Sequence, residues 1–380
     1  MTTNRLRLLH EAGQSVWLDY IDRTMLKNGA LQKLIDEDAL MGMTSNPTIF
    51  EKALAEGHAY DEQIKDASGD LSAWQLFELV ETEDVRDACD IFAGVYRATK
   101  GKDGFVSIEV SPGVAHDANA TIEEARRLWA TVGRPNVMVK VPGTVEGAKA
   151  VRRLTAEGIN VNITLLFSID AHARVIEAYL AGLEERSAAG QPIDNISSVA
   201  SFFVSRVDTE IDKRLDAIAA SSKDAMRDRI LALRGKAAVG NARLAYRLFM
   251  QQFSGPRWAA LAGKGARVQR PLWASTGTKN PAYRDVLYVE TLIGPDTVNT
   301  LPPATINSFR DHGDVARTVD SEWSAAEQLV HELEQCGVSL KDVTDKLLSD
   351  GLTSFQKSFD TLIGGLERKA AELGKSLASA

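Results

Sequence analysis

Eight short runs of apolar and β-branched residues, each followed by a stretch with helical periodicity or a loop, limit the folds available to this chain. Such runs are too apolar for a sheet with one wet face and are typical of parallel strands that are buried on both faces. Because strand and helix alternate along the chain, the sequence predicts an α/β protein whose strands close into a (β/α)8 TIM barrel. The expected strands are 14–20, 40–47 with its loop, 105–110, 136–142, 159–166, 196–204, 268–274 and 297–302.

An open, doubly wound sheet is the competing fold. Such a sheet would normally carry a Gly-x-Gly-x-x-Gly turn or a Gly-x-x-x-x-Gly-Lys-Ser/Thr loop after a strand, and neither motif follows any of the eight runs. The six histidines have no metal-ligand spacing, and the two cysteines, Cys89 and Cys336, form no Cys-x-x-Cys pair. The sequence therefore favours the barrel, and we expect neither a metal nor another cofactor.

Helical stretches account for most of the remaining chain. We expect a single barrel domain over 1–380, with an N-terminal helix within 1–13, a helical insertion of two or three helices over 206–264 and C-terminal helices over 321–380. The Ala/Ser/Lys-rich end, Lys369 to Ala380, is expected to be frayed. A solvated basic face is expected within the insertion, formed by Arg234, Lys236, Arg243, Arg247, Arg257 and Lys264.

The charge of the chain limits its partners. A formal net charge of −8 and a pI near 5.4 argue against a general affinity for nucleic acid or for an anionic membrane. The first 15 residues contain Arg5, Arg7 and Glu11 but no long apolar segment, so neither a signal peptide nor a transmembrane helix is expected. A cytoplasmic location follows by default, and the oligomeric state is left open between a monomer and a homodimer.

Lys140 stands near the end of an otherwise apolar run. Burial disfavours a charged amine, so a lysine in such a strand either pairs with a carboxylate or acts as a reactive amine. Catalytic groups of TIM barrels lie at the carboxyl ends of the strands. This chain places polar residues at most of those ends: Asp19, Asn46, Glu109, Lys140, Asn162, Thr164, Ser201, Arg206, Ser275 and Thr276.

Each of these residues also has a purely structural explanation. Asp19 could be a turn or cap residue, Glu109 could pair with a neighbouring cation, and Asn46 precedes a proline, where it is a common turn residue. Arg206 and Lys279 could be ordinary surface charges. Their joint placement nevertheless predicts an active site with a nucleophilic amine, two carboxylates and donors that orient a polyol, which are the groups that imine chemistry needs.

Four segments resemble motifs of the transaldolase family, in the longer bacterial form that also occurs fused to glucose-6-phosphate isomerase. The resemblance covers about Gln14 to Leu301 and implies a (β/α)8 barrel, in agreement with the strand pattern. The four segments are Thr44-Ser45-Asn46-Pro47-Thr48-Ile49-Phe50, Val139-Lys140-Val141-Pro142, Asn160-Val161-Asn162-Ile163-Thr164-Leu165-Leu166-Phe167-Ser168 and Ser201-Phe202-Phe203-Val204-Ser205-Arg206.

The resemblance implies a reaction in which a dihydroxyacetone unit moves from sedoheptulose 7-phosphate to glyceraldehyde 3-phosphate, in the pentose phosphate pathway. Lys140 would form a Schiff base with the C2 ketone of the donor, and Asp19 would take the proton from the C4 hydroxyl. Glu109 and Thr164, bridged by a water, would move protons while the imine forms and hydrolyses. The implied substrate-binding residues are Asn46, Asn162, Ser201 and Phe203 around the dihydroxyacetone unit, and Arg206, Ser275 and Lys279 around the phosphate.

Two positions separate the chain from a related family member, and two depart from the better-known transaldolases. Glu109 and Phe203 differ from the glutamine and tyrosine of fructose-6-phosphate aldolase. Phe202 replaces the proline of the Ser-Pro-Phe motif, and Gly277 stands where an arginine follows the phosphate-binding serine, so that Lys279 would supply the missing charge. An aldolase that releases free dihydroxyacetone, or a sugar-phosphate-binding barrel without turnover, remain the alternatives.

Overall fold

The computed structural model of the chain describes residues 4–55, 57–67 and 71–378. Its eight parallel strands follow the chain order around a closed barrel, in which β8 pairs with β1. The prediction of a TIM barrel is confirmed. The strands are β1 (Gln14–Asp19), β2 (Leu40–Thr44), β3 (Phe105–Glu109), β4 (Val137–Pro142), β5 (Val161–Leu166), β6 (Ser198–Phe203), β7 (Gln269–Ala274) and β8 (Thr297–Leu301).

The strands are buried on both faces, as their composition predicts. Every residue of β3 to β8 is buried, and only Asp19 in β1 and Met41 in β2 are partly exposed. The N-terminal end of the barrel contains a buried ion pair, in which Arg270 Nη2 lies 2.9 Å from Asp103 Oδ1, and Ser15 Oγ donates to Asp103 Oδ2 at 2.7 Å. These side chains fill that end, so the open end of the barrel is the one where the strands finish.

Helices cover the outside of the barrel and extend the chain beyond it. Segment 206–264 contains four helices, α10 to α13, and not the two or three expected, because α11 and α13 have only eight residues each and leave little periodic signal. No helix of the described residues is long and apolar enough to cross a membrane. The N-terminal and C-terminal predictions reach residues 1–3 and 379–380, which lie outside the described ranges. The helices are α1 (Arg5–Glu11), α2 (Arg23–Lys27), α3 (Ala30–Asp38), α4 (Pro47–Ala55), α5 (Asp61–Asp66), α6 (Ala73–Ala98), the 3-10 helix η1 (Pro112–Val114), α7 (Ala118–Val132), α8 (Val145–Glu157), α9 (Ile169–Ala188), α10 (Ser205–Ser221), α11 (Asp224–Leu231), α12 (Ala237–Gln252), α13 (Gly255–Ala262), α14 (Leu287–Glu290), α15 (Pro303–His312), α16 (Trp323–Gln335) and α17 (Leu340–Glu372).

Arginines of this helical segment form ion pairs with distant helices. Arg247 Nη2 on α12 lies 2.5 Å from Glu327 Oε1 on α16, and Arg257 Nε on α13 lies 2.7 Å from Glu184 Oε1 on α9. Arg257 is exposed, as expected of a solvated face, whereas Arg247 is only partly exposed, and both arginines are paired with carboxylates. Their partners are far away in the sequence, and local periodicity carries no information about such pairs.

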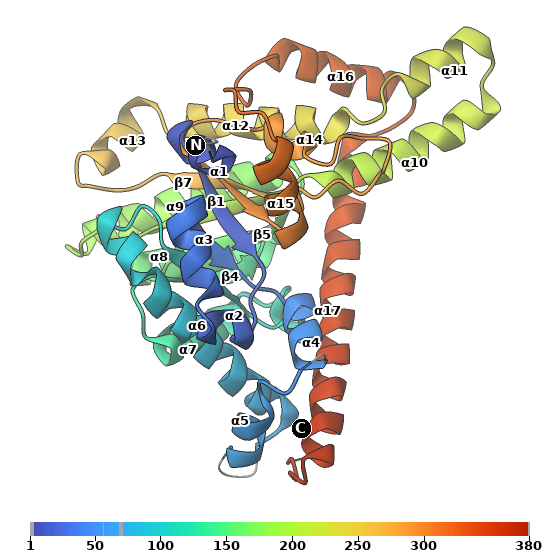
Figure 1. Cartoon of the computed structure of the whole chain (residues 1–380). Coiled ribbons are helices and arrows are strands. Elements are labelled where there is room, and N and C mark those ends of the chain that lie inside the picture. Colours follow the sequence, from blue (N-terminus) through green and yellow to red (C-terminus); the bar gives the residue numbers. More distant parts are fainter. Residues whose placement is uncertain (1–3, 56, 68–70, 379–380) are drawn as a thin grey trace.

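The last helix, α17, has 33 residues and packs beside the open end of the barrel. It contacts α4, α10 and β5, and in Figure 1 it runs beside α4 along one side of the molecule. A Cβ atom added at Gly351 of α17 would stand 3.0 Å from a methyl group of Leu165, which belongs to β5. The helix therefore closes part of the space above the strand ends.

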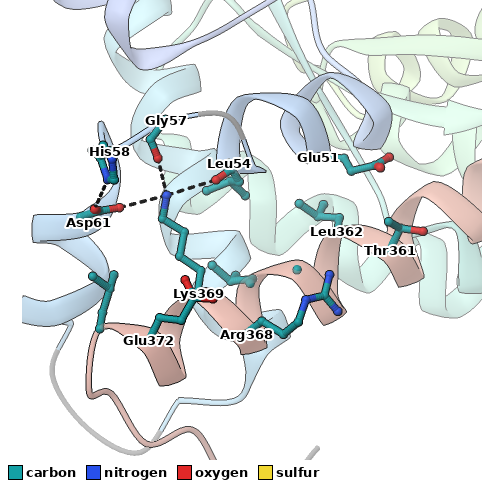
Figure 2. A pocket seen from close by; sticks show the side chains of 13 residues that line it. Glu51, Leu54, Gly57, His58, Asp61, Thr361, Leu362, Arg368, Lys369 and Glu372 are labelled. Carbon is teal, nitrogen blue, oxygen red and sulfur yellow. Dashed lines mark hydrogen bonds and ion pairs between the residues drawn. The ribbon is translucent and has the colours of Figure 1, made fainter.

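The C-terminal end of α17 is anchored to the end of α4, to Gly57 and to the start of α5 (Figure 2). Lys369 Nζ donates to the carbonyl oxygen of Leu54 at 3.1 Å and to that of Gly57, and it lies 2.9 Å from Asp61 Oδ1. These residues line a cavity of about 570 Å³ outside the barrel. Three bonds from one ammonium hold α17 against these residues.

The chain stays attached beyond this lysine. Lys375 Nζ donates to the carbonyl oxygen of Ala67, and the Ala378 backbone N–H donates to the carbonyl oxygen of Leu71 at 2.9 Å. The expected fraying is therefore wrong for the described part, Lys369 to Ala378. The prediction of a frayed end relied on composition alone, and composition does not indicate which carbonyl groups this end will bind.

Candidate active site

A cavity of about 420 Å³ opens at the carboxyl ends of the strands. Nine of the eleven predicted site residues line this cavity. The other two, Glu109 and Asn162, lie behind it and form hydrogen bonds with residues that line it. Thr276 instead turns into the protein and donates to Asn299 Oδ1 at 2.9 Å. The structure thus brings the eleven residues together and leaves Thr276 outside the site. The nine that line the cavity are Asp19, Asn46, Lys140, Thr164, Ser201, Phe203, Arg206, Ser275 and Lys279.

Lys140 lies on β4 directly opposite Glu109 on β3, because the two residues are partners in the register of the parallel strands. Lys140 Nζ lies 3.0 Å from Glu109 Oε2 and donates to the carbonyl oxygen of Ser45 at 3.0 Å. Both side chains are about 6% exposed. A buried amine with one carboxylate and one carbonyl partner still faces the cavity, where it can meet a carbonyl carbon.

The two carboxylates of the site have different environments. Glu109 is bonded to Lys140, whereas Asp19 at the end of β1 accepts a hydrogen bond from Thr44 Oγ1 at 2.9 Å. Burial raises the pKa of both carboxyl groups, and the ammonium of Lys140 opposes that rise in each case. Two carboxyls on either side of one amine, with different hydrogen-bond partners, can carry separate proton-transfer roles.

A chain of hydroxyl and amide groups runs beside Lys140. Asn162 on β5 is the register partner of Lys140; its Oδ1 accepts from Ser201 Oγ at 2.6 Å, and its Nδ2 donates to Ser107 Oγ at 3.0 Å. These bonds fix the orientation of the amide. Thr164, two residues further along β5, has a buried hydroxyl without a hydrogen-bond partner among the described residues, and it lines the cavity. That hydroxyl is available to a substrate or a water.

Cationic residues gather at the outer part of the cavity. Arg206, in the first turn of α10, lies over the Phe203 ring with its guanidinium carbon 5.3 Å from the ring centroid. Ser275, which follows β7, has a φ of 56° and accepts the Ser205 backbone N–H at its carbonyl oxygen (3.1 Å). The left-handed conformation turns the chain at Ser275 toward Lys279, which also lines the cavity. This end offers an anion both charge and hydroxyl donors.

Sequence reasoning missed several lining residues. Thr44 and Thr300 lie at the ends of β2 and β8, and their hydroxyl oxygens are 2.7 Å apart. Because catalytic residues of TIM barrels lie at the carboxyl ends of the strands, the sequence could have indicated both. Lys52 on α4 and Phe355 on α17 also line the cavity, but they come from helices. No local signal distinguishes them from other helical residues.

No group of three or more His, Cys, Asp or Glu residues suited to a metal ion occurs in the described ranges. The barrel and its buried, carboxylate-paired lysine define the class of protein: a TIM barrel with an amine at the base of a polar cavity. The family model "Transaldolase/Fructose-6-phosphate aldolase" matches residues 16–366, and the chain belongs to this family.

Relatives with assigned names agree with this membership. The chain is 49% identical over 370 residues to the transaldolase of Thermobifida fusca, an alignment that covers 97% of this chain and 98% of the relative. It is 46% identical over 374 residues to transaldolase 2 of a Nostoc species, again over 97% of this chain and 98% of the relative. The family resemblance inferred from the four motifs is confirmed.

Proposed function

We propose that this protein is a transaldolase that transfers dihydroxyacetone from sedoheptulose 7-phosphate to glyceraldehyde 3-phosphate, through a Schiff base on Lys140. The products are erythrose 4-phosphate and fructose 6-phosphate. The observation that carries the proposal is the contact of Lys140 Nζ with Glu109 Oε2 at 3.0 Å, at the base of a cavity whose polar lining consists mainly of hydroxyl groups and cations. Membership of the transaldolase family supports the same reaction.

The chemistry divides between the amine and the carboxylates. The neutral amine of Lys140 adds to the C2 ketone, and loss of water gives a protonated imine. Asp19 accepts the proton of the C4 hydroxyl as the C3–C4 bond breaks. The electron pair of that bond moves into the imine, and an aldose phosphate leaves. The resulting enamine attacks the acceptor aldehyde, Asp19 returns the proton, and hydrolysis of the imine frees Lys140.

Glu109 and Thr164 serve the steps that add and remove water. Glu109 touches Lys140 directly, so it can exchange protons with the amine and with a water at C2. The unpartnered hydroxyl of Thr164 can hold that water in the cavity. Burial raises the pKa of Glu109 toward neutral pH. A group that both gives and takes protons is most effective when its pKa is near the working pH.

The remaining residues bind the sugar. Asn46, Asn162 and Ser201 bind the dihydroxyacetone hydroxyls; the Asn162 amide keeps one N–H and one lone pair beyond its two bonds. Phe203 forms a side of the cavity beneath Arg206. Arg206, Ser275 and Lys279 bind the phosphate.

A reductive trap tests the proposal. Borohydride added with fructose 6-phosphate should convert the imine to a stable secondary amine, and peptide mass analysis should find the added sugar carbons on Lys140. Omission of fructose 6-phosphate is the control. An adduct on a different lysine, or none, contradicts the proposal. Product analysis with and without an acceptor aldehyde then separates transfer from release of free dihydroxyacetone, and a binding protein would show no turnover.

The phosphate end gives a further prediction. The loop after β7 carries Ser275 and Lys279, and Tyr283 fastens it to α10 by donating to Asp212 Oδ2 at 2.6 Å. Tyr283→Phe removes this bond, so we expect the KM for fructose 6-phosphate to rise about threefold to tenfold with a smaller change in kcat. Steady-state kinetics measure it. Tyr246→Phe removes a comparable bond at the other end of the barrel, to the carbonyl oxygen of Pro295, and should leave KM unchanged; equal effects of both variants would refute the prediction.

We also propose a single barrel domain in which 206–264 and 321–380 are additions, because α12 contacts β7 and α17 contacts β5. A cytoplasmic location and a monomer or homodimer complete the proposal. The acidic net charge of −8 supports an absence of general nucleic-acid affinity. Light scattering of the purified chain distinguishes a monomer from a homodimer.

A further inference from the structure

Lys52 lines the cavity but comes from a helix and not from the end of a strand. It lies on α4, one turn after Thr48, and both residues line the cavity. One face of this short helix therefore borders the open end of the barrel. Thr48 Oγ1 also donates to Ser358 Oγ of α17 at 2.9 Å. The helix that carries Lys52 is therefore held in place over the mouth.

The cavity has more positive than negative charge at its rim. Lys140 is paired with Glu109, whereas Lys52, Arg206 and Lys279 have no carboxylate within ion-pair distance in the described part of the chain. Asp19 is the one carboxylate among the described residues that line the cavity. Three unpaired cations around one cavity, in a chain with a net charge of −8, favour an anionic ligand there.

The topology places these cations on opposite sides of the mouth. Lys52 follows β2 and Arg206 follows β6, and three strands lie between β2 and β6 in either direction around the closed barrel of eight. A ligand that extends outward from Lys140 passes between them. Lys52 can thus approach a phosphate from the side that neither Arg206 nor Lys279 covers.

We propose that Lys52 is a phosphate-binding residue that determines the preference of this site for phosphorylated over unphosphorylated sugars. The inference rests on the proposed function and names one more residue of the same site. Lys52 is exposed. Its ammonium forms a charge-assisted hydrogen bond with a phosphate oxygen when the sugar phosphate is bound. The phosphate dianion is then neutralised from both sides of the mouth.

The test compares Lys52→Met with the wild type in two independent measurements. Calorimetry measures the dissociation constant of inorganic phosphate, and we expect it to rise roughly tenfold in the variant. Kinetics with fructose 6-phosphate and free fructose as donors measure specificity, and the ratio of their kcat/KM values should fall by roughly the same factor. Lys52→Arg should restore most of both effects, because it retains a positive charge at that position.

Lys65→Met is the matched control, since Lys65 is an exposed lysine on the neighbouring helix α5 and does not line the cavity. It should keep the wild-type phosphate affinity and the wild-type specificity ratio. An unchanged phosphate dissociation constant in Lys52→Met overturns the inference, as does an equal loss with both donors. If the wild type does not turn over fructose 6-phosphate, the proposed function fails, and the phosphate affinities still decide the role of Lys52.

Discussion

Lys140→Ala should lower kcat/KM for transfer from fructose 6-phosphate to erythrose 4-phosphate by at least about 10⁴-fold, because removal of a covalent nucleophile eliminates the pathway that it opens. The variant should still fold. Its Glu109 loses its cationic partner, but burial already raises the pKa of this carboxyl, so the group can become neutral by taking up a proton. Steady-state kinetics and thermal unfolding measure the two effects.

Two variants separate the nucleophile from the charge of Lys140. Lys140→Arg keeps a cation beside Glu109 but has no amine that can deprotonate, so it should be as inactive as Lys140→Ala. Lys140→Ala combined with Glu109→Gln removes both charges and should be more stable than Lys140→Ala alone at neutral pH. Activity within tenfold of the wild type in either single variant would show that Lys140 is not the nucleophile.

The fold could be predicted because each strand carries its own signal. A run such as Val137 to Val139 is apolar on both faces, and only a strand covered on both sides can bury it. The alternation of eight such runs with helices leaves few closed arrangements. The number of helices over 206–264 was underestimated, since α11 and α13 have eight residues each, which is barely two turns of periodicity.

The site could be predicted as far as it depends on strand ends. Glu109 and Lys140 end adjacent strands, so their proximity follows from the barrel, although the register that sets them opposite one another does not. Lys52 and Phe355 were missed because they depend on where α4 and α17 pack. That packing depends on contacts such as those of Lys369 with Leu54, between residues far apart in the sequence.

A buried histidine should make the protein less stable in acid. His172 on α9 is fully buried against the Phe202 ring, and neither ring nitrogen has a hydrogen-bond partner among the described residues. Burial lowers the pKa of His172 to about 4, whereas a histidine in the unfolded chain has a pKa of about 6.5. As the pH falls from 6.5 to 4, the unfolded state binds a proton that the folded state does not. The free energy of unfolding should therefore fall by about 3 kcal/mol over this range from His172 alone.

His172→Leu removes this titration, so its free energy of unfolding should fall by about 3 kcal/mol less than that of the wild type between pH 6.5 and pH 4 in urea denaturation. Tyr179→Phe is the control on the same helix. It removes the hydrogen bond from Tyr179 to the carbonyl oxygen of Arg267, and because burial raises the pKa of this tyrosine, the loss should be equal at every acidic pH. If His172→Leu and the wild type lose stability in parallel, His172 takes up its proton in the folded state, and a water or a local opening must give the ring a partner that the static structure does not provide.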